Sequence, residues 1–293
     1  MAHSTLVKGS LYAVLCFFSM ALLGVFTKMA TRDGHEIWTS VVMYITATLL
    51  MLPFMLREGV ESFKTKHPFK HFFRAAIGLS ATSLYLLSMQ KIPIVNATLL
   101  FNSSPLFIPI MATMFLKVHV ELRTWLAIAL GFIGITFIIK PTLSIFDHIG
   151  DFYGLGSGIA LAGAYLMVKV LTETESHNRI AFYFVFIAAL IQLPFLSVAG
   201  PVLSTHDFMF AVLAGASLMV AQMSLVRAYA YAEASQVGVY QYTSVVFVGL
   251  IDWMFWGIIP AWIDLVGVVL VVIAGVIIIR SGSAAKAKSR VNS

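Results

Sequence analysis

The sequence predicts an all-α membrane protein with ten transmembrane helices, arranged as two inverted five-helix repeats around a central cavity. Composition is the first reason: the 293 residues are 60% apolar and 11% charged, whereas about 25% of the residues of soluble domains are charged. The second reason is that the apolar residues form runs of about 18 or more, long enough to cross a bilayer as helices. The third is that the two halves of the chain resemble each other.

Each apolar run is expected to form one helix, and the runs alternate with short polar connections. In chain order the predicted spans are 8–29, 37–56, 71–90, 94–116, 122–140, 152–171, 178–200, 208–231, 236–257 and 262–280. The first span could be mistaken for a signal peptide. We predict a mature helix instead, because the sixth span repeats it in mid-chain and no clear cleavage site follows it.

The self-similarity has a nearly constant offset of 141 residues. Leu52–Phe54 recurs as Leu193–Phe195, and Gly134 recurs as Gly275. Internal repeats in an apolar chain are typical of secondary transporters, whose halves move around a shared site.

The repeat divides the chain into five parts. We predict a cytoplasmic N-terminal tail (1–8), a first five-helix repeat (9–140), a periplasmic linker (141–151), a second repeat (152–280) and a basic cytoplasmic tail (281–293) that is expected to be disordered.

Lysine and arginine positions predict the orientation in the cell inner membrane. With both termini in the cytoplasm, four of these residues fall outside and fourteen inside, which is the bias expected of cytoplasmic loops. The inside residues are Lys8, Arg57, Lys64, Lys66, Lys70, Arg74, Lys117, Arg123, Lys169, Arg179, Arg280, Lys286, Lys288 and Arg290. Because five spans are an odd number, the second repeat enters the membrane inverted. The net charge of +6 therefore reflects topology and does not indicate nucleic acid.

Four segments resemble a known family. Asn102–Phe107 is similar to a mid-helix proline segment of the EamA-type members of the drug/metabolite transporter superfamily, and Gln241–Val246 is similar to its counterpart in the second repeat. Gly134–Lys140 and Gly275–Arg280 resemble the ends that close each repeat. The resemblance runs from about Gly9 to Arg280. It implies a helical basket whose cavity is lined by the third, fourth, eighth and ninth spans, with the first and sixth nearby. It also implies transport of small metabolites, most commonly amino acids and related zwitterions.

Charged candidates inside the spans are few. Of the thirteen Asp and Glu residues, twelve fall in predicted loops or at helix ends and Asp252 lies within a span; Arg227 is the one basic residue well inside a span. A titratable group in the membrane can hold a proton, and a guanidinium can hold an anion. The alternative is that both lie near the membrane surface and reach toward headgroups.

The fourth span is the strongest candidate for a site. Pro105 and Pro109 predict a helix break, because proline lacks an N–H and clashes with the preceding turn. Asn102 and Ser103 provide polar groups at the same depth. Broken helices in lipid face protein or a wet cavity, although a packing kink is the alternative.

The ninth span and its neighbours provide further polar groups near mid-membrane. They suit a small amphipathic ligand, although cross-helix packing could explain them as well. The complete set of candidate substrate-binding residues is Tyr85, Asn102, Ser103, Gln222, Tyr240, Gln241, Tyr242 and Ser244.

The motifs of common enzyme classes do not occur in the sequence. Neither a GxxxxGK[ST] loop nor an HExxH, GxSxG or Cys/His cluster is present, so we expect no enzyme activity, no cofactor and no metal. The expected partners are a small-molecule substrate and the lipid bilayer, with no nucleic acid, and the protein is expected to be a monomer or homodimer. We predict a secondary transporter of amino-acid-like or zwitterionic metabolites, with export favoured. The alternatives are an uptake carrier for nucleoside-like, vitamin or S-adenosylmethionine-like cargo, and a non-transporting membrane scaffold.

Overall fold

The computed structural model describes residues 2–31, 35–141, 148–200, 202–257 and 259–291, and these residues are nearly all helical. In chain order the elements are α1 (Ala2–Ala30), α2 (Glu36–Arg57), η1 (Val60–Phe63), α3 (Pro68–Met89), α4 (Ile94–Phe101), α5 (Ser104–Leu116), α6 (Leu122–Ile139), α7 (Ile149–Leu171), α8 (His177–Gln192), η2 (Leu193–Val198), α9 (Thr205–Tyr231), α10 (Ala234–Val239), α11 (Tyr242–Trp256) and α12 (Trp262–Val291). Among the described residues, nine spans are long and apolar enough to cross a membrane. The remaining predicted span corresponds to α10 and α11 together.

Local signals place several helix starts. Pro68 occupies the first turn of α3, where its missing N–H has no helical partner to lose. The Ser176 and Ser204 side chains cap α8 and α9 by accepting from the backbone N–H groups of Arg179 and Asp207. These caps satisfy N–H groups that would otherwise be exposed where each helix enters the bilayer.

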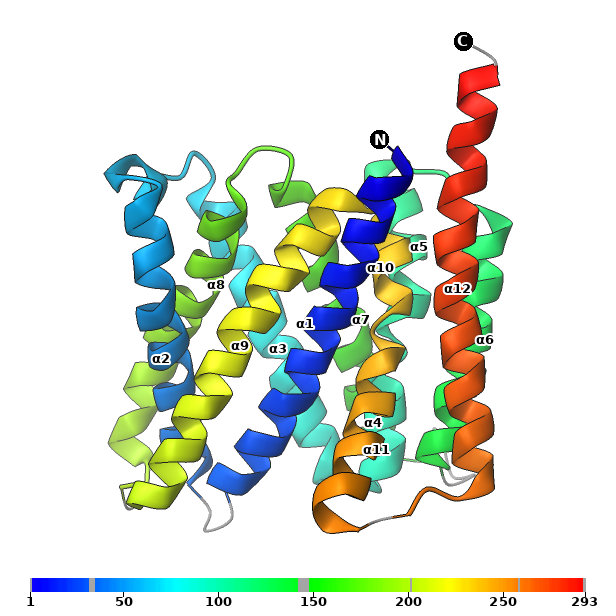
Figure 1. Ribbon diagram of the computed structural model, residues 1–293. Coiled ribbons are helices and arrows are strands. Elements are labelled where there is room, and N and C mark those ends of the chain that lie inside the picture. Colours follow the sequence, from blue (N-terminus) through cyan, green and yellow to red (C-terminus); the bar gives the residue numbers. More distant parts are fainter. Residues whose placement is uncertain (1, 32–34, 142–147, 201, 258, 292–293) are drawn as a thin grey trace.

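The two halves run in opposite directions through the same layer. In Figure 1, α1 descends from the face on which α12 ends, whereas α7, the first helix of the second half, ascends from the opposite face. Contacts between helices occur in equivalent pairs: α1 packs on α9 as α7 packs on α3, and α1 contacts α11 as α7 contacts α5. The predicted inverted repeat is therefore confirmed. We call the face where α1 begins and α12 ends the terminus face.

Close helix approach depends on glycine at two crossings. A Cβ on Gly267 of α12 would lie 2.5 Å from the carbonyl oxygen of Gly134 in α6, and a Cβ on Gly215 of α9 would lie 2.6 Å from the carbonyl oxygen of Met43 in α2. Since backbone atoms cannot rotate away as side chains do, a larger residue at either position would force the helices apart. These contacts hold the outer helices around the centre.

Two helices are interrupted near the middle of the molecule, one in each half. α4 ends at Phe101 and α5 begins at Ser104, while α10 ends at Val239 and α11 begins at Tyr242. Pro105, at the start of α5, has no N–H to offer the carbonyl of Phe101, as the sequence predicts. The prediction for Pro109 is wrong, because this residue lies within a continuous α5. One missing backbone bond does not end a helix that its neighbours hold.

The ends of the chain differ partly from the prediction. The C-terminal tail is not irregular: α12 continues through the basic segment to Val291, as Figure 1 shows. Alternation of Ala and Lys favours helix there, since both are good helix formers. Within the predicted linker 141–151, residues 142–147 lie outside the described residues, as do Met1 and residues 292–293. Both ends lie on one face, and the orientation of that face in the cell stays a prediction.

Candidate functional site

A cavity of about 320 Å³ lies between the two halves of the molecule. Both repeats contribute to it, with residues from α1, α2, α3, α4, α7, α8, α9 and α11 and from the two helix interruptions. Its lining residues are Phe17, Met20, Leu23, Thr27, Met43, Tyr44, Arg74, Gly78, Thr82, Phe101, Asn102, Leu161, Ala164, Tyr165, Phe184, Leu218, Gln222, Leu225, Gln241 and Ser244. The volume is at the lower end of the range of about 300–1,000 Å³ that is usual for small-molecule sites.

The two helix interruptions meet at the cavity wall. The Ser104 hydroxyl donates to Oε1 of Gln241 at 2.6 Å, and Nε2 of Gln241 donates to Oδ1 of Asn102 at 3.3 Å. Asn102 in turn donates to the carbonyl of Thr98 at 2.9 Å. One glutamine side chain therefore joins the broken helix of the first repeat to that of the second. Broken helices of this kind form the substrate sites of many transporters.

Arg74 places a positive charge at the wall of this cavity. Its side chain projects from the second turn of α3 and is 3% exposed. Nη2 donates to Oε1 of Gln222 at 2.7 Å, and the guanidinium carbon lies 4.1 Å from the ring centroid of Phe184. Nε and Nη1 are buried and make no hydrogen bond with any described residue. A buried guanidinium with unused donors is costly, so this position is a candidate binding point.

The rest of the cavity is largely apolar. Phe17 and Met20 of α1, Phe101 of α4 and Phe184 of α8 are among the lining residues. Polar side chains gather at the helix interruptions and around Arg74. A ligand that fits both parts has an apolar body and a polar or charged end.

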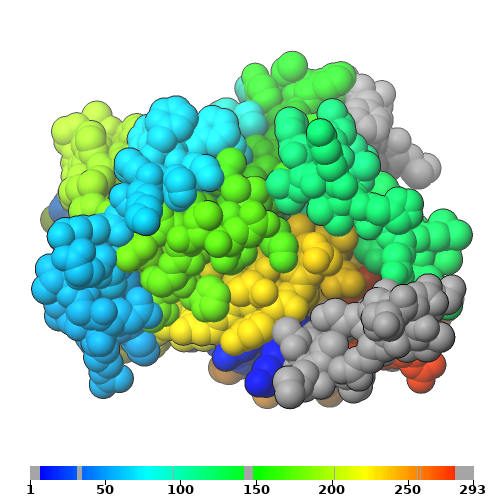
Figure 2. Space-filling model, turned by 90° about the horizontal axis from the view of Figure 1, so that it is seen from above, coloured from blue at the N-terminus to red at the C-terminus, as the bar shows by residue number. Residues whose placement is uncertain are grey.

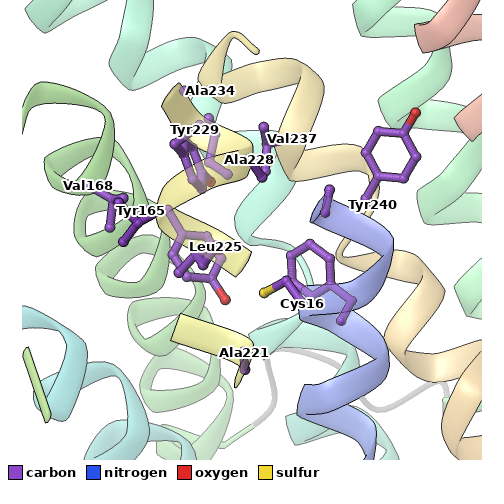
Figure 3. Packing of buried hydrophobic residues seen from close by; sticks show 14 of the residues in the cluster. Cys16, Tyr165, Val168, Ala221, Leu225, Ala228, Tyr229, Ala234, Val237 and Tyr240 are labelled. Carbon is purple, nitrogen blue, oxygen red and sulfur yellow. The ribbon is translucent and has the colours of Figure 1, made fainter. Parts of the chain in front are cut away.

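On the terminus face the cavity is closed by buried side chains, which we call the tyrosine plug (Cys16, Tyr165, Leu225 and Tyr229). Tyr165 of α7 and Tyr229 of α9 lie with ring centroids 6.0 Å apart. Figure 3 shows these residues packed together between α1, α7 and α9. Toward the other face, the lining includes Thr82, whose side chain is exposed. Access to the cavity is therefore closed on the terminus face.

A network of polar contacts lies beyond the plug and ties the two halves together. Arg179 donates through Nε to the carbonyl of Ser62 at 2.6 Å and through Nη2 to the carbonyl of Glu61 at 3.0 Å. Its Nη1 binds Glu175 at 2.6 Å, and Glu175 also accepts from Thr65 at 2.6 Å. In Figure 2 the segment after α2 (blue) lies against the start of α8 (green) on this face. We call these contacts the closing network.

The carboxylate of Glu175 is held ionised. Burial alone would raise its pKa, but hydrogen bonds from Arg179 and Thr65 outweigh burial, so the pKa is lowered. The closing network therefore stays charged at neutral pH. The network has a second branch. Nη2 of Arg227 donates to Oδ1 of Asn178 at 3.1 Å, and Nδ2 of Asn178 donates to Oε1 of Glu58 at 2.6 Å.

Four of the eight predicted binding residues line the cavity, namely Asn102, Gln222, Gln241 and Ser244. Their role in binding substrate stays a prediction.

The other four point elsewhere, which corrects the prediction of one common site. The Tyr85 hydroxyl bonds Thr98 at 2.9 Å, and Ser103 bonds the carbonyl of its own preceding turn. The Tyr240 hydroxyl donates to the hydroxyl of Ser10 at 2.8 Å and points away from the plug in Figure 3. Tyr242 is fully buried against α6. All four take part in helix packing, which is the alternative to ligand binding that the sequence left open.

Neither charged candidate lies in the cavity. Nη1 of Arg227 donates to the carbonyl of Met223, one turn earlier in α9, at 3.0 Å, and its Nη2 bonds Asn178 in the closing network. Asp252 is half-buried near the far end of α11, away from the lining residues. These positions agree better with the interpretation that both residues lie near the membrane surface than with a role in holding a proton or an anion in the cavity.

Arg74 is the residue that sequence reasoning misplaced. Arg74 falls in the first turn of the predicted span 71–90, so the sequence assigns its charge to the cytoplasmic end of that span. α3 begins at Pro68 instead, which puts Arg74 on the second helical turn, inside the bundle. Proline at the first helical position is a known start signal, and it could have placed Arg74 one turn deeper in the helix.

The bundle, the paired helix interruptions and the shared cavity together define a secondary-transporter type of membrane protein. Comparison with known proteins agrees. The sequence profile of the EamA-like transporter family matches residues 7–140 and again 148–280. The chain therefore belongs to the EamA-like transporter family.

Similar proteins carry several transporter names. The chain is 26% identical to a pseudopaline exporter of Pseudomonas aeruginosa, over 96% of this chain and 99% of the relative. It is 29% identical to a riboflavin transporter of Rhizobium johnstonii (95% and 93%) and 24% identical to an S-adenosylmethionine uptake transporter of Rickettsia felis (99% and 97%). One solved crystal structure has the same fold, with a TM-score of 0.78 over 99% of both chains at 15% identity. Family and relatives indicate a transporter rather than an enzyme.

Proposed function

We propose that this protein moves a small amphipathic organic metabolite, of the amino-acid-like or zwitterionic class, across the cell inner membrane by alternating access. The cavity of about 320 Å³ is the observation that supports this most directly. It lies where the broken helices of the two repeats meet, joined by Gln241. A site on the axis between inverted repeats can open to either side through similar motions of the two halves.

Export is the direction that we propose. The named pseudopaline exporter, which matches 96% of this chain, supports it. Uptake is the second candidate, favoured by the relatives named as S-adenosylmethionine uptake transporters. The same cavity serves either direction, and the gradients across the membrane select one.

Metabolite profiling tests the function and its direction together. Cells with and without the gene are compared, and metabolites are measured both inside the cells and in the medium. Export predicts that one class of small metabolite rises in the medium and falls inside when the protein is present. Uptake predicts the opposite change.

The matched variant is Gln241→Leu, which keeps the side-chain size but removes the amide that joins the two halves. It is expected to abolish the difference at normal membrane levels. If the wild-type protein changes no metabolite in either compartment, the transport proposal fails.

A further inference from the structure

We propose that Arg74 binds a carboxylate group of the substrate, so that the cargo is a monocarboxylate with an apolar or aromatic body. This inference rests on the proposed transport function and narrows it to a substrate class. The starting point is the hydrogen bonding of the guanidinium. Of its three nitrogens only Nη2 has an acceptor, Oε1 of Gln222 at 2.7 Å, while buried Nε and Nη1 have none among the described residues.

The geometry of the free donors matches a carboxylate. A guanidinium carries five N–H groups in one plane, and Gln222 occupies one of them. Nη2 carries two hydrogens, and Gln222 uses one of them. The other hydrogen is parallel to an N–H group of a neighbouring nitrogen, so one edge of the guanidinium still presents two parallel N–H groups. Such an edge binds both oxygens of a carboxylate at once.

The charge around Arg74 points to an anionic ligand. Among the described residues that line the cavity, Arg74 is the one formally charged side chain. The buried acid Glu175 does not line the cavity and is bonded to Arg179 at 2.6 Å and to Thr65. A single negative charge would neutralise Arg74, whereas a phosphate would bring more charge than one guanidinium balances. A carboxylate therefore fits better than a phosphate.

The apolar surroundings indicate the rest of the ligand. Phe184 already covers one face of the guanidinium at 4.1 Å, and Phe17, Met20 and Phe101 line the space beyond. An aromatic or aliphatic body can fill this space while its carboxylate meets Arg74. Ser244 also lines the cavity, and its hydroxyl, which donates to the carbonyl of Gln241 at 2.7 Å, can still accept a hydrogen bond from a neutral polar group.

The test compares three forms of the protein in the metabolite-profiling assay: wild type, Arg74→Gln and Arg74→Lys. We expect the metabolites moved by the wild type to carry a carboxylate. Their transport should fall about ten- to hundredfold in Arg74→Gln, the loss expected for a hydrogen-bonded ion pair. Arg74→Lys keeps the charge without the fork and should also be impaired. Arg123→Gln, the same change at an exposed position on the terminus face, is the control and should transport normally.

Purified protein in detergent gives an independent readout. The probes are phenylalanine and indole-3-acetate, each compared with its primary amide in a thermal-shift measurement. Wild type should be stabilised more by the acids than by the amides, and Arg74→Gln should lose this preference. Without ligand, Arg74→Gln should melt no lower than wild type, because a buried charge without a counter-ion has been removed.

The outcomes separate this inference from the transport proposal. If wild type moves metabolites that lack an anionic group, or if both Arg74 variants move them at the wild-type rate, the inference is overturned and transport stands. If the wild type moves nothing, the transport proposal itself fails. Should Arg74→Gln be absent from the membrane, the Arg74→Lys rates decide.

Discussion

Weakening the closing network at Arg179 is expected to open the cavity toward the terminus face. The informative change is the double variant Arg179→Met with Glu175→Gln. Methionine keeps the apolar stem of Arg179 but removes the bonds to the carbonyls of Ser62 and Glu61. Glutamine at 175 prevents a buried carboxylate from being left without its partner, and it can still accept from Thr65. The variant therefore isolates the two bonds that Arg179 makes between the halves.

The size of the effect follows from those two bonds. A hydrogen bond with a charged donor contributes about 1.5–3 kcal/mol. The Arg179 side chain is 18% exposed, so water screens it and the lower value applies. Two bonds at that value give about 3 kcal/mol, which corresponds to about a hundredfold change in the equilibrium between closed and open forms.

Cys16 provides the assay without any added label. It is the single cysteine of the chain and lies fully buried in the tyrosine plug. A maleimide supplied on the terminus face can reach it only when the plug opens. If closing is faster than labelling, the labelling rate follows the open population. We expect the double variant to label about a hundred times faster than wild type.

Two comparisons decide the interpretation. Arg123→Met removes an exposed arginine from the same face and should label at the wild-type rate, and Glu175→Gln alone should show only a small increase. A double variant that labels within twofold of wild type would refute the view that Arg179 holds this face closed. Equal acceleration in Arg123→Met would do the same.

Acid should weaken the same contact. The pKa of Glu175 is lowered from its ordinary value of 4.5, so its contribution to the closed form is complete above about pH 4.5 and is lost as pH falls through the lowered pKa. Wild type should therefore lose thermal stability below pH 4.5 more steeply than Glu175→Gln. Parallel curves for the two proteins would contradict this linkage.

Three further predictions test the fold and the site. Tyr240→Phe should cost about 1 kcal/mol of stability and leave transport rates unchanged in the profiling assay, because its hydroxyl lies outside the cavity. Gly267→Ala should destabilise by about 1–3 kcal/mol in a thermal melt, whereas Gly249→Ala, which meets nothing within 4 Å, should not. With Cys16 replaced, cysteine at Val60 (74% exposed) should react with an impermeant reagent only after cell permeabilisation, while cysteine at Val202 (70% exposed) should react in intact cells; the reverse pattern would invert the topology.

The spans and the inverted repeat were predictable because they depend on composition and period. Long apolar runs leave few options in a bilayer, where backbone groups must be paired within the segment. The helix interruption before Pro105 could also be predicted from the sequence, since proline lacks the backbone N–H that a helix needs and clashes with the preceding turn. The matching interruption at Tyr240–Gln241 has no proline to announce it. It is held by side chains of the other repeat, notably Ser104 and Asn102 through Gln241, and such long-range contacts cannot be read from local sequence.

The site was predicted only in part, because sequence gives the depth of a residue better than the direction it faces. Tyr240 and Ser244 are both predicted to bind substrate, and their spacing of four residues would place them on one face of a continuous helix. The interruption at Gln241 changes the rotation of the following helix, so Ser244 faces the cavity while Tyr240 faces Ser10. Arg74 was missed for the converse reason. α3 begins three residues before the predicted span, so Arg74 lies on the second helical turn and lines the cavity instead of the cytoplasmic end of the helix.

The charge of Arg74 has an electrical consequence. In the proposed alternating-access cycle the cavity opens first to one side of the membrane and then to the other, so Arg74 is exposed in turn to the electrical potential of each side. For one elementary charge this difference is worth about 2.3 kcal/mol per 100 mV. With the termini in the cytoplasm, as we propose, an inside-negative voltage favours the empty form that opens inward. A cargo with one net negative charge cancels it, so that loaded form turns outward without electrical work, whereas a zwitterion leaves the positive charge of Arg74 in place. Voltage would then power the return of the empty protein and favour the release of organic anions from the cell.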